Sequence, residues 1–382
     1  MSSETDEERK GTEYSEMEEN NQVKKRFISN IPLVVVEVIL LCISMGILYV
    51  VTLTTSTVEK VDMNIDNIQV NEEVAEKTFF SVAGNKNKKQ DPVKATGYRN
   101  IALFGVDSRA GDLGAGTRSD SIMICSINQD TNEVSLISVY RDTYLNVGDD
   151  VYTKCNAAYA KGGPERAISM LNTNMDLNIT DYVTVGFEGL IEAIDALGGV
   201  EIDINASEIS HLNNYQLCMS EELGIPYTEV YEEGIQNLNG MQATAYCRIR
   251  YTKGDDYKRA ERQRTVLTAM VEKAKTVSFT KLSSAVVAIM PNIATSLSTT
   301  EIISVMSAGT AYEVKESSGF PVEKYRTAGR IGKGDCIIPK TLEDNVKELH
   351  LMLYGEENYE PSQTVKEYSR VIKEKTDPYL NQ

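Results

Sequence analysis

Histidine is nearly absent from this chain of 382 residues, which contains only His211 and His350. The two histidines are far apart in the sequence, and neither belongs to a known catalytic or metal-binding pattern. This scarcity argues against a Ser-His-Asp triad, an HExxH zinc site and a histidine general base. A general base in this protein would therefore be a carboxylate, a tyrosine or a lysine.

Cysteine is also sparse, and its spacing gives no sign of a metal site. Cys42 lies in an apolar run, and the other cysteines are Cys125, Cys155, Cys218, Cys247 and Cys336. None of them forms a CxxC pair. Because the cysteines outside the apolar run are odd in number, we do not expect a complete disulfide framework. We expect buried free thiols instead.

Basic residues are too few for a general nucleic-acid-binding surface. The chain has 39 Lys and Arg against 56 Asp and Glu, which gives a formal net charge of −17. Phosphate backbones attract broad basic faces, so no nucleic-acid partner is expected. The length and the hydrophobic content of 41% allow one large domain or two ordinary ones, plus a tail.

The N-terminal region has the pattern of a single-pass membrane protein. Residues 1–30 form an acidic segment with few apolar side chains, which predicts a disordered cytoplasmic tail. Residues 31–53 carry one charge, Glu37, and are long enough to span a bilayer as a transmembrane helix. A removable signal peptide would have a shorter apolar core, whereas a buried core helix remains an alternative. The basic cluster at 24–26 places the preceding side in the cytoplasm and the rest of the chain outside.

The remaining sequence divides into three parts. Residues 54–97 are polar and predict an extracytoplasmic stalk, residues 98–355 predict the main folded domain, and residues 356–382 predict a polar C-terminal tail. Within the domain, strand patterns alternate with helix patterns. The predicted strands are 100–108, 121–128, 133–143, 182–188 and 200–204, and the predicted helices are 162–176, 189–199, 240–250, 256–275, 278–312 and 341–354. This order predicts the α/β class, as an α/β/α sandwich whose mixed central sheet contains a hairpin.

Charged side chains and glycines are concentrated in the loop at 105–121. The charged residues of this loop are Asp107, Arg109, Asp112, Arg118 and Asp120. The loop matches neither the Walker A nor the Rossmann pattern. Two carboxylates at neighbouring strand ends would suit a hard cation such as Mg²⁺. The alternative is a surface loop with local salt bridges.

A second charged pair, Arg141 and Asp142, ends the apolar strand predicted at 133–143. Loops that follow strands of an α/β sheet usually form the ligand-binding side. The pair could therefore contact a ligand, or it could be a buried structural ion pair.

The third cluster is the segment 247–264, which gathers seven Arg and Lys in 18 residues of an acidic chain. If a helix begins near Asp256, then Asp256, Arg259 and Gln263 lie on one face of it. The segment also contains Arg248 and Arg250 before the helix, and Arg262 at the edge of that face. Guanidinium groups bind phosphate oxygens bidentately, so a pocket formed by these residues would suit a phosphate or pyrophosphate. The alternative is a solvated helix face.

These clusters and the segments between them resemble the LytR-CpsA-Psr (LCP) family of cell-envelope proteins. The resemblance extends from about Asn100 to Val271. It rests on "NIALFGVDSR…RSDSIMICSIN…VSLISVYRDT", "KCNAAYAKGG", "GLIEAIDALGGVEIDI", "LNGMQATAYCRIRY" and "GDDYKRAERQR". The order and spacing of these motifs are specific, and the single span before an outer domain matches the family's layout.

The resemblance implies an LCP-like fold and a glycopolymer–peptidoglycan phosphotransferase. Such an enzyme takes teichoic acid, capsule or another secondary wall polymer from a polyprenyl-pyrophosphate carrier and attaches it to peptidoglycan. It also implies Mg²⁺ as the cofactor, with Mn²⁺ as the alternative, and it places the catalytic domain, residues 98–355, on the outer side of the cell membrane. The glycan itself is not identified, because all of these polymers present the same pyrophosphate.

Residue roles follow from the motif positions. Asp107 and Asp120 match the family's Mg²⁺-associated aspartates, and Asp107 and Arg141 are the catalytic candidates. The pyrophosphate-binding candidates are Arg109, Arg118, Arg141, Lys154, Arg248, Arg250, Asp256, Arg259, Arg262 and Gln263. The chain departs from the pattern at Tyr140, where family members often have proline.

A pyrophosphate carrier on a prenyl chain would need cationic groups beside an apolar groove, which we expect between the sheet and its helices. Two other functions remain open. In the first, water replaces the sugar hydroxyl, and the protein is a lipid-pyrophosphate hydrolase. In the second, the protein is a membrane-bound transcriptional attenuator, which the predicted topology opposes because residues 1–30 contain no DNA-binding element.

Overall fold

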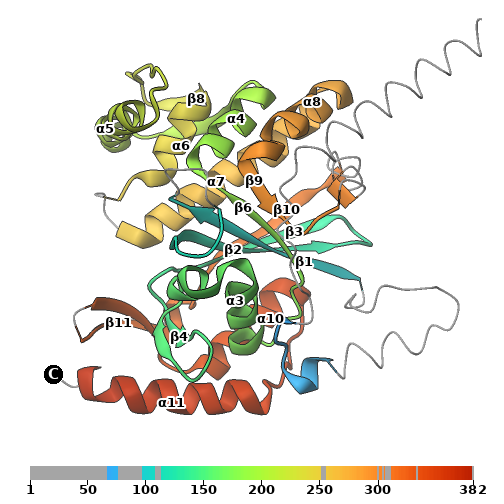
Figure 1. Ribbon diagram of the computed structural model, residues 1–382, viewed down its shortest axis with the longest axis vertical. Coiled ribbons are helices and arrows are strands. Elements are labelled where there is room, and N and C mark those ends of the chain that lie inside the picture. Colours follow the sequence, from blue (N-terminus) through green and yellow to red (C-terminus); the bar gives the residue numbers. More distant parts are fainter. Residues whose placement is uncertain are drawn as a thin grey trace, which may run out of the picture. The chain divides into compact units, whose positions relative to one another are not determined.

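The computed structural model of the protein (Figure 1) describes residues 67–75, 97–107, 113–250, 255–298, 301–302, 305, 311–332 and 334–380. These residues belong to one unit of the chain, Thr57–Gln382. The predicted cytoplasmic tail, the predicted transmembrane helix and most of the predicted stalk lie outside the described residues. Within the described part of the chain, no helix is both long enough and apolar enough to cross a membrane.

A central mixed sheet organises the domain, as the sequence predicted. The strands of this sheet are β1 (Tyr98–Val106), β2 (Ser119–Asn128), β3 (Glu133–Val139), β6 (Asp181–Val185), β9 (Ile293–Thr295) and β10 (Glu313–Phe320). Their spatial order is β10-β3-β2-β1-β6-β9. β1–β2, β2–β3 and β6–β9 are antiparallel, whereas β1–β6 and β3–β10 are parallel.

The predicted hairpin joins β2 to β3, and its turn chemistry explains why it forms. The side-chain oxygen of Asn128 accepts hydrogen bonds from the backbone N–H groups of Asp130 and Thr131, at 2.9 and 3.1 Å. Asn132 adopts a positive φ of 61°, which asparagine tolerates better than most residues. The hairpin brings the start of β2 to the same edge of the sheet as the ends of β1 and β3.

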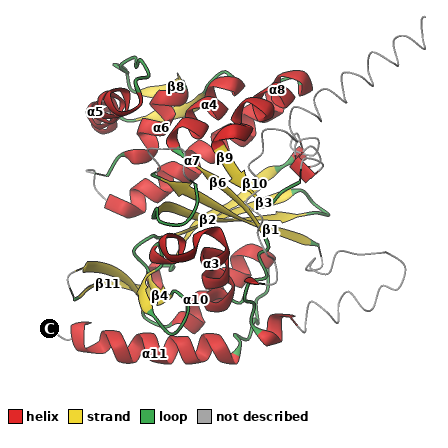
Figure 2. Ribbon diagram, in the orientation of Figure 1, coloured by secondary structure: helices red, strands yellow, loops and turns green. Residues whose placement is uncertain are grey.

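Helices cover both faces of the sheet, which confirms the three-layer sandwich (Figures 1 and 2). One layer contains α4 (Phe187–Leu197), α5 (Ala206–Leu223), α6 (Gly240–Arg248), α7 (Asp255–Thr276) and α8 (Phe279–Ile289). The other contains α3 (Ala157–Met175), α10 (Leu342–Tyr354) and α11 (Gln363–Leu380). The helix predicted at 189–199 is α4, which ends where Gly198 takes a φ of 90°.

Within the described residues, three two-stranded sheets lie outside the central sheet. They pair β4 (Tyr144–Asn146) with β5 (Tyr152–Lys154), β7 (Val200–Ile204) with β8 (Gly234–Leu238), and β11 (Arg326–Ile331) with β12 (Gly334–Pro339). The strand predicted at 200–204 therefore forms, but it pairs with β8 in the layer of α4–α8. Its inward residues Val200, Ile202 and Ile204 join the buried cluster of that layer.

The predictions for the C-terminal part were incomplete. Residues 278–312 were predicted as helix, but α8 ends at Ile289, and after a short 3₁₀ turn (Met290–Asn292) the chain forms edge strand β9. The prediction of a polar peripheral tail at 356–382 was wrong. Val365 and Ile372 of α11 are buried in the main core, because apolar residues recur there at helical spacing within a mostly polar helix.

Part of the predicted stalk also packs on the domain. The Asn71 side chain is buried, and its amide donates to Asp176 at 2.6 Å, to the Ser362 hydroxyl at 3.2 Å and to the Thr173 carbonyl at 3.0 Å. The Asp176 carboxylate in turn accepts from the Ser362 N–H at 2.7 Å. Residues 67–75 are thus tied to α3 and to the chain just before α11.

Candidate active site

A cavity of about 540 Å³ lies between the sheet and the helices α4, α6 and α7. Its walls are mostly apolar, with side chains that include Leu103, Met123, Val183, Phe187, Leu190, Ala193, Val266, Leu267, Met270 and Ile293. This confirms the apolar groove expected between the sheet and its helices. No sequence signal marked its lining residues individually, because apolar residues on α4 and α7 have the pattern of ordinary core positions.

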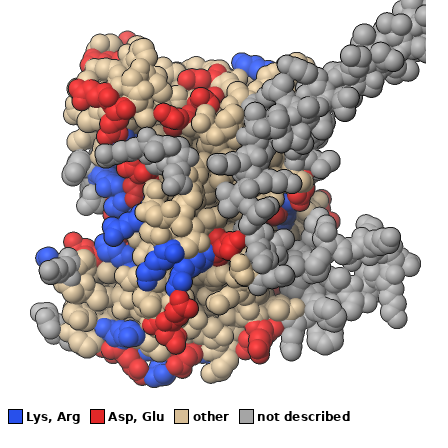
Figure 3. All heavy atoms as spheres, in the orientation of Figure 1, with Lys and Arg blue, Asp and Glu red and all other residues tan. Residues whose placement is uncertain are grey.

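Polar residues line one part of this cavity, and the sheet topology explains why they meet there. Asp107 follows β1, Arg141 follows β3, and Asp120 lies at the start of the antiparallel strand between them. All three line the cavity. From the helical layer they are joined by Arg248, Arg250, Arg259 and Gln263. On the face shown in Figure 3, Lys and Arg side chains gather at the level of the central sheet.

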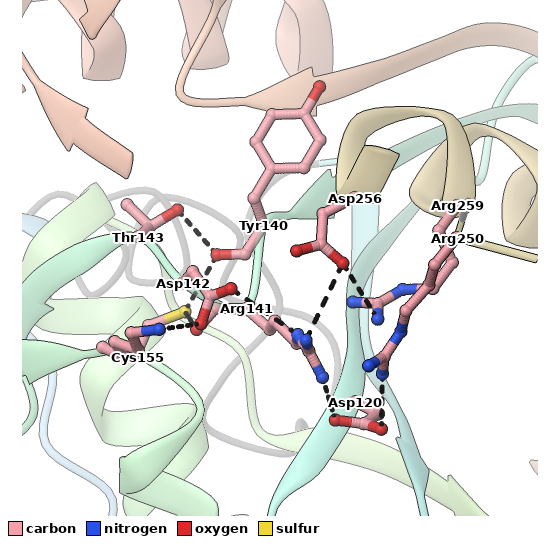
Figure 4. A network of polar contacts seen from close by, with 10 residues as sticks. Asp120, Tyr140, Arg141, Asp142, Thr143, Cys155, Arg250, Asp256 and Arg259 are labelled. Atoms are coloured by element: carbon pink, nitrogen blue, oxygen red, sulfur yellow. Dashed lines mark hydrogen bonds and ion pairs between the residues drawn. The ribbon is translucent and has the colours of Figure 1, made fainter. Parts of the chain in front are cut away.

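Arg141 is at the centre of a network of carboxylates and guanidinium groups (Figure 4). Its Nη1 donates to Asp120 Oδ1 at 2.7 Å, and its Nη2 lies 3.8 Å from Asp256 Oδ1. The same Asp256 oxygen is 2.9 Å from Arg259 Nη1, and Asp120 Oδ2 is 3.4 Å from Arg250 Nη2. Burial lowers the pKa of Arg141. The nearby carboxylate charges of Asp120, Asp256 and Asp142 and the hydrogen bond to Asp120 raise this pKa by more, so it lies above its ordinary value.

The Arg259 guanidinium is buried, but its hydrogen-bond donors are only partly satisfied. Its side chain is only 6% exposed, and its Nε has no hydrogen-bond partner within the described part of the chain. Its Nη1 is close to Asp256 but is not aligned for a hydrogen bond. Burial and the charge of Arg141 lower the pKa of Arg259 to about 10. An anion entering the cavity would supply the missing hydrogen-bond acceptors and stabilise this charge.

Arg248 and Gln263 complete the cavity's polar side. The Arg248 guanidinium lies 4.5 Å from the Phe187 ring centroid and 5.6 Å from that of Tyr215, and it is 3.7 Å from the Glu222 carboxylate. Its Nη1 has no aligned acceptor among the residues that the structure describes. Aromatic rings hold a guanidinium without neutralising it, and the Glu222 carboxylate is not hydrogen-bonded to Nη1, so Arg248 keeps a donor for an anion. Arg118 is exposed just before β2, and Arg109 lies outside the described residues.

Comparison with known proteins shows the family of this chain and agrees with its fold. The pattern of the LytR_cpsA_psr family matches residues 55–335. The chain belongs to this family. Its fold resembles that of the LytR-CPS2A-psr family protein YwtF (TagT) with bound octaprenyl pyrophosphate lipid, which is known from Bacillus subtilis. That match has a TM-score of 0.51 and 20% identity and covers 70% of this chain and 94% of the other.

Two curated LytR-CpsA-Psr relatives show what the sequence is similar to. The polyisoprenyl-teichoic acid–peptidoglycan teichoic acid transferase TagU of Oceanobacillus iheyensis is 34% identical over 186 residues, covering 47% of this chain and 52% of the relative. The biofilm regulatory protein A of Streptococcus mutans is 31% identical over 185 residues, covering 46% of this chain and 43% of the relative. The chain thus matches about half the length of these relatives.

Lys154 lies beside this LytR-CpsA-Psr site but outside the cavity. Its ammonium group is 2.8 Å from Asp142 Oδ1, and Asp142 Oδ2 is 3.7 Å from Arg141 Nε. Lys154 therefore neutralises a carboxylate next to Arg141, and it is not among the residues that line the cavity. Asn156 is buried, and its backbone N–H donates to the Arg141 carbonyl at 3.2 Å.

The structure contradicts the predicted role of Arg262 in pyrophosphate binding. Arg262 and Glu208 are each about 5% exposed, and Arg262 Nε donates to Glu208 Oε1 at 2.7 Å. Arg262 Nη1 also donates to the Ile249 carbonyl at 3.1 Å. Asp256, Arg259 and Gln263 do share one face of α7, as predicted, but Arg262 falls on a neighbouring face that packs against α5 and α6. Sequence spacing alone left the orientation of this edge position open.

We expect Arg262 to stabilise the fold without acting on substrate. Replacing Arg262 with methionine should reduce the free energy of unfolding by about 3–5 kcal/mol, because it leaves the buried Glu208 carboxylate without its charged partner and, among the described contacts, with only the hydrogen bond from the Asn205 N–H. The measurement is urea unfolding followed by circular dichroism. Changing Glu208 to Gln in the same protein should restore part of the loss. A marked loss of activity per folded molecule would contradict the assignment.

The described cysteines are free thiols, as expected. Cys155 and Cys336 are buried, and Cys247 is a buried residue in the cavity wall. Cys125 is partly exposed and Cys218 is exposed, so the expectation of burial fails for these two, and Cys42 lies outside the described residues. Burial raises the pKa of Cys247 to about 12, which keeps this thiol protonated and unreactive at neutral pH.

Proposed function

We propose that this protein is a phosphotransferase that moves a glycopolymer from a polyprenyl-pyrophosphate carrier to peptidoglycan. The observation that carries the proposal is a single cavity that joins a long apolar wall to a cluster of incompletely paired arginines. A lipid pyrophosphate has the same two-part chemistry. The names of the TagU relative and of the YwtF (TagT) lipid complex support this choice.

In this proposal the prenyl chain lies against the apolar walls and the pyrophosphate lies among Arg141, Arg248, Arg250 and Arg259. Arg259 and Arg248 retain unused donors in the described network. Arg141 is held by Asp120 and Asp256, so its guanidinium is oriented before substrate arrives. Fixed donors of this kind stabilise charge that develops during phosphoryl transfer without needing to reorganise.

The reaction is a displacement at the phosphorus next to the glycan. The oxygen of an acceptor sugar hydroxyl forms a bond to this phosphorus, and the bond to the bridging oxygen breaks, so that polyprenyl phosphate leaves. The hydroxyl proton goes to a carboxylate. Asp107 lines the cavity and is the candidate for this role, because the two histidines of the chain lie elsewhere. The arginines stabilise the negative charge on the transferred phosphoryl group and on the leaving phosphate.

The carboxylates of the cavity suit a divalent cation whose coordination is completed by the substrate. Among the described residues, no group of three His, Cys, Asp or Glu forms a ready metal site. Mg²⁺, however, is commonly held by one or two carboxylates together with substrate phosphates and water. Asp107 and Asp120 line the same part of the cavity. Asp120 would be the main carboxylate for the ion, and Asp107 would contribute one oxygen to it while its other oxygen accepts the hydroxyl proton. When bound, the ion would neutralise charge on the phosphates.

Replacing Asp120 with alanine should produce a defect that depends on metal. The transfer rate at low Mg²⁺ should fall about tenfold or more, in the range expected for loss of a group that supports charge stabilisation, and should recover in part as Mg²⁺ or Mn²⁺ is raised. Calorimetry with Mn²⁺ and a pyrophosphate ligand should show weaker metal binding. Asp149→Ala is the control, because the Asp149 side chain is 76% exposed. A defect that no metal concentration relieves would count against this role.

We also propose that the domain is anchored in the cell membrane by one N-terminal transmembrane helix at 31–53, with its N-terminus in the cytoplasm and the catalytic domain outside. The apolar run and the basic cluster before it support this topology. A tethered domain would meet a membrane-borne carrier at high local concentration. A reporter fused after residue 380 should be active only outside the cytoplasm, and a cytoplasmic reporter signal would contradict the topology.

The function is tested with the full chain in detergent, a radiolabelled lipid-linked glycan and a peptidoglycan acceptor. Label that becomes attached to the acceptor supports the transferase. Label that is released as a free phosphorylated glycan, with equal rates with and without acceptor, identifies a hydrolase. No turnover of the lipid under either condition would overturn the proposal.

A further inference from the structure

Three side chains from distant parts of the chain pack together beside the Arg141 network. Tyr140 precedes Arg141, Tyr257 follows Asp256 in α7, and Arg326 begins β11. The Tyr140 and Tyr257 ring centroids are 4.8 Å apart at an interplanar angle of 88°. The Arg326 guanidinium lies 3.9 Å from the Tyr257 centroid and 5.1 Å from that of Tyr140. The three residues bring together β3, α7 and the β11–β12 hairpin.

The surroundings of Tyr140 are shaped to hold this ring. Tyr140 is 8% exposed, and its hydroxyl accepts a hydrogen bond from Arg326 Nη1 at 3.2 Å. The same Nη1 donates to the Pro321 carbonyl at 3.1 Å. A Cβ at Gly319 would lie only 2.1 Å from the Tyr140 hydroxyl oxygen, so the glycine makes the space that the phenol occupies. The backbone N–H of Tyr140 donates to the Phe320 carbonyl at 3.0 Å.

These two tyrosines, which pack edge to face, are the chain neighbours of two site residues that must be placed accurately. Arg141 Nη2 and Asp256 Oδ1 are 3.8 Å apart, a separation at which Asp256 orients Arg141 without fully occupying its donors. Asp256 also holds Arg259 at 2.9 Å. The distance between Arg141 and Asp256 depends on how the end of β3 sits against the start of α7. Packing between Tyr140 and Tyr257 joins these two elements, and the Arg326 guanidinium contacts both rings.

We propose that Arg326 is a positioning residue, which through Tyr140 and Tyr257 holds Arg141 and Asp256 in the geometry needed to bind and transfer a pyrophosphate. This inference rests on the proposed function. Arg326 lies outside the residues that line the cavity and acts only through its two aromatic neighbours. Small displacements of charge-stabilising groups cost large factors in rate, up to about 100-fold for roughly 1 Å.

The test compares Arg326→Met with Arg326→Lys, Tyr140→Phe and the matched control Arg330→Met, an exposed arginine on the same strand. Arg326→Met should lower the transfer kcat about tenfold and raise KM for the lipid donor by the smaller factor of about threefold, because the apolar cavity is untouched. The kcat of Arg326→Lys should lie between those of wild type and Arg326→Met. The lysine ammonium keeps a positive charge near the ring but lacks the planar guanidinium with its two parallel donors. Arg330→Met should leave both constants unchanged.

Two further measurements separate positioning from folding and from the proposed function. Adding Tyr140→Phe to Arg326→Met should cause no further loss, because both changes remove the same contact. Binding of inorganic pyrophosphate, measured by calorimetry, should weaken at least about threefold in Arg326→Met and remain unchanged in Arg330→Met. If wild type binds pyrophosphate but transfers nothing, the proposed function fails and the binding data still decide the role of Arg326.

The inference is overturned by any of three results. The first is a kcat of Arg326→Met within twofold of that of Arg330→Met. The second is a loss that disappears once rates are divided by the folded fraction from circular dichroism. The third is unchanged pyrophosphate binding in folded Arg326→Met.

Discussion

Replacing Arg141 with alanine should lower the transfer rate about 100-fold or more. Arg141 combines three features that make this loss large: its position at the end of a buried strand, its salt bridge to Asp120 at 2.7 Å and its place in the cavity lining. Removal of one preorganised donor that stabilises developing charge typically costs a factor of about 10²–10³. The measurement is the initial rate of glycan transfer with saturating lipid donor.

The comparison variants separate the geometry of Arg141 from its charge. Arg141→Lys should recover little, because a point charge cannot reproduce a bidentate fork between Asp120 and a phosphate. Arg370→Ala is the control, since that arginine is 56% exposed on α11. Raising Mg²⁺ should relieve the Asp120→Ala defect but not the Arg141→Ala defect. An Arg141→Ala enzyme that keeps its rate within about threefold would mean that the arginine network is only structural.

Filling the apolar cavity should abolish productive binding of the lipid donor. Ala193 is 9% exposed on α4, and its side chain lines the cavity, so Ala193→Phe would place a ring where the prenyl chain is proposed to lie. Displacing even two methylene groups from apolar contact costs about 1.6 kcal/mol, which is more than tenfold in affinity. We therefore expect KM for a long-chain donor to rise at least about tenfold.

This variant should remain folded, because the added ring enters an existing cavity of about 540 Å³. Its thermal midpoint should equal or exceed that of wild type. Glu188→Phe, an exposed position on the same helix, is the control for adding an aromatic ring to α4. A donor with a short prenyl chain should be affected much less than the natural carrier. Equal losses for short and long donors would show that the chain does not occupy this cavity.

The strands nearest the site could be predicted from local sequence. β1, β2 and β3 are runs of apolar residues with short polar boundaries, and the Asn128 turn between β2 and β3 has recognisable chemistry. Strand ends in such a sheet meet at one edge, so the charged residues that follow or begin these strands were correctly expected to lie together. The helical spacing of Asp256, Arg259 and Gln263 likewise predicted that they share one face of α7, and the structure turns Arg259 and Gln263 of that face into the cavity at this edge.

Other parts depended on contacts that no local pattern reveals. β10 is mostly polar and pairs in parallel with β3, about 180 residues away in the sequence, which only long-range packing determines. α11 is polar except for a narrow stripe that includes Val365 and Ile372, and its burial depends on the partner surface formed by α3 and α10. Helical spacing did not determine the orientation of Arg262, because this residue lies at the border of the predicted polar face. Its direction depends on the neighbouring helix, where Glu208 provides a carboxylate.

The sequence by itself therefore determined the chemical groups of this protein: the carboxylates and arginines at strand ends, the family pattern and the apolar run before the domain. These features are local, since they depend on residue type and on spacing within one element. The tertiary structure decided which groups act together. In the tertiary structure Arg259, and not Arg262, lines the cavity, and ordinary core residues form the apolar wall. Long-range packing also brings Arg326 to Tyr140 and Tyr257. Such choices follow from packing between elements that are distant in the chain, which is where side-chain direction and burial are set.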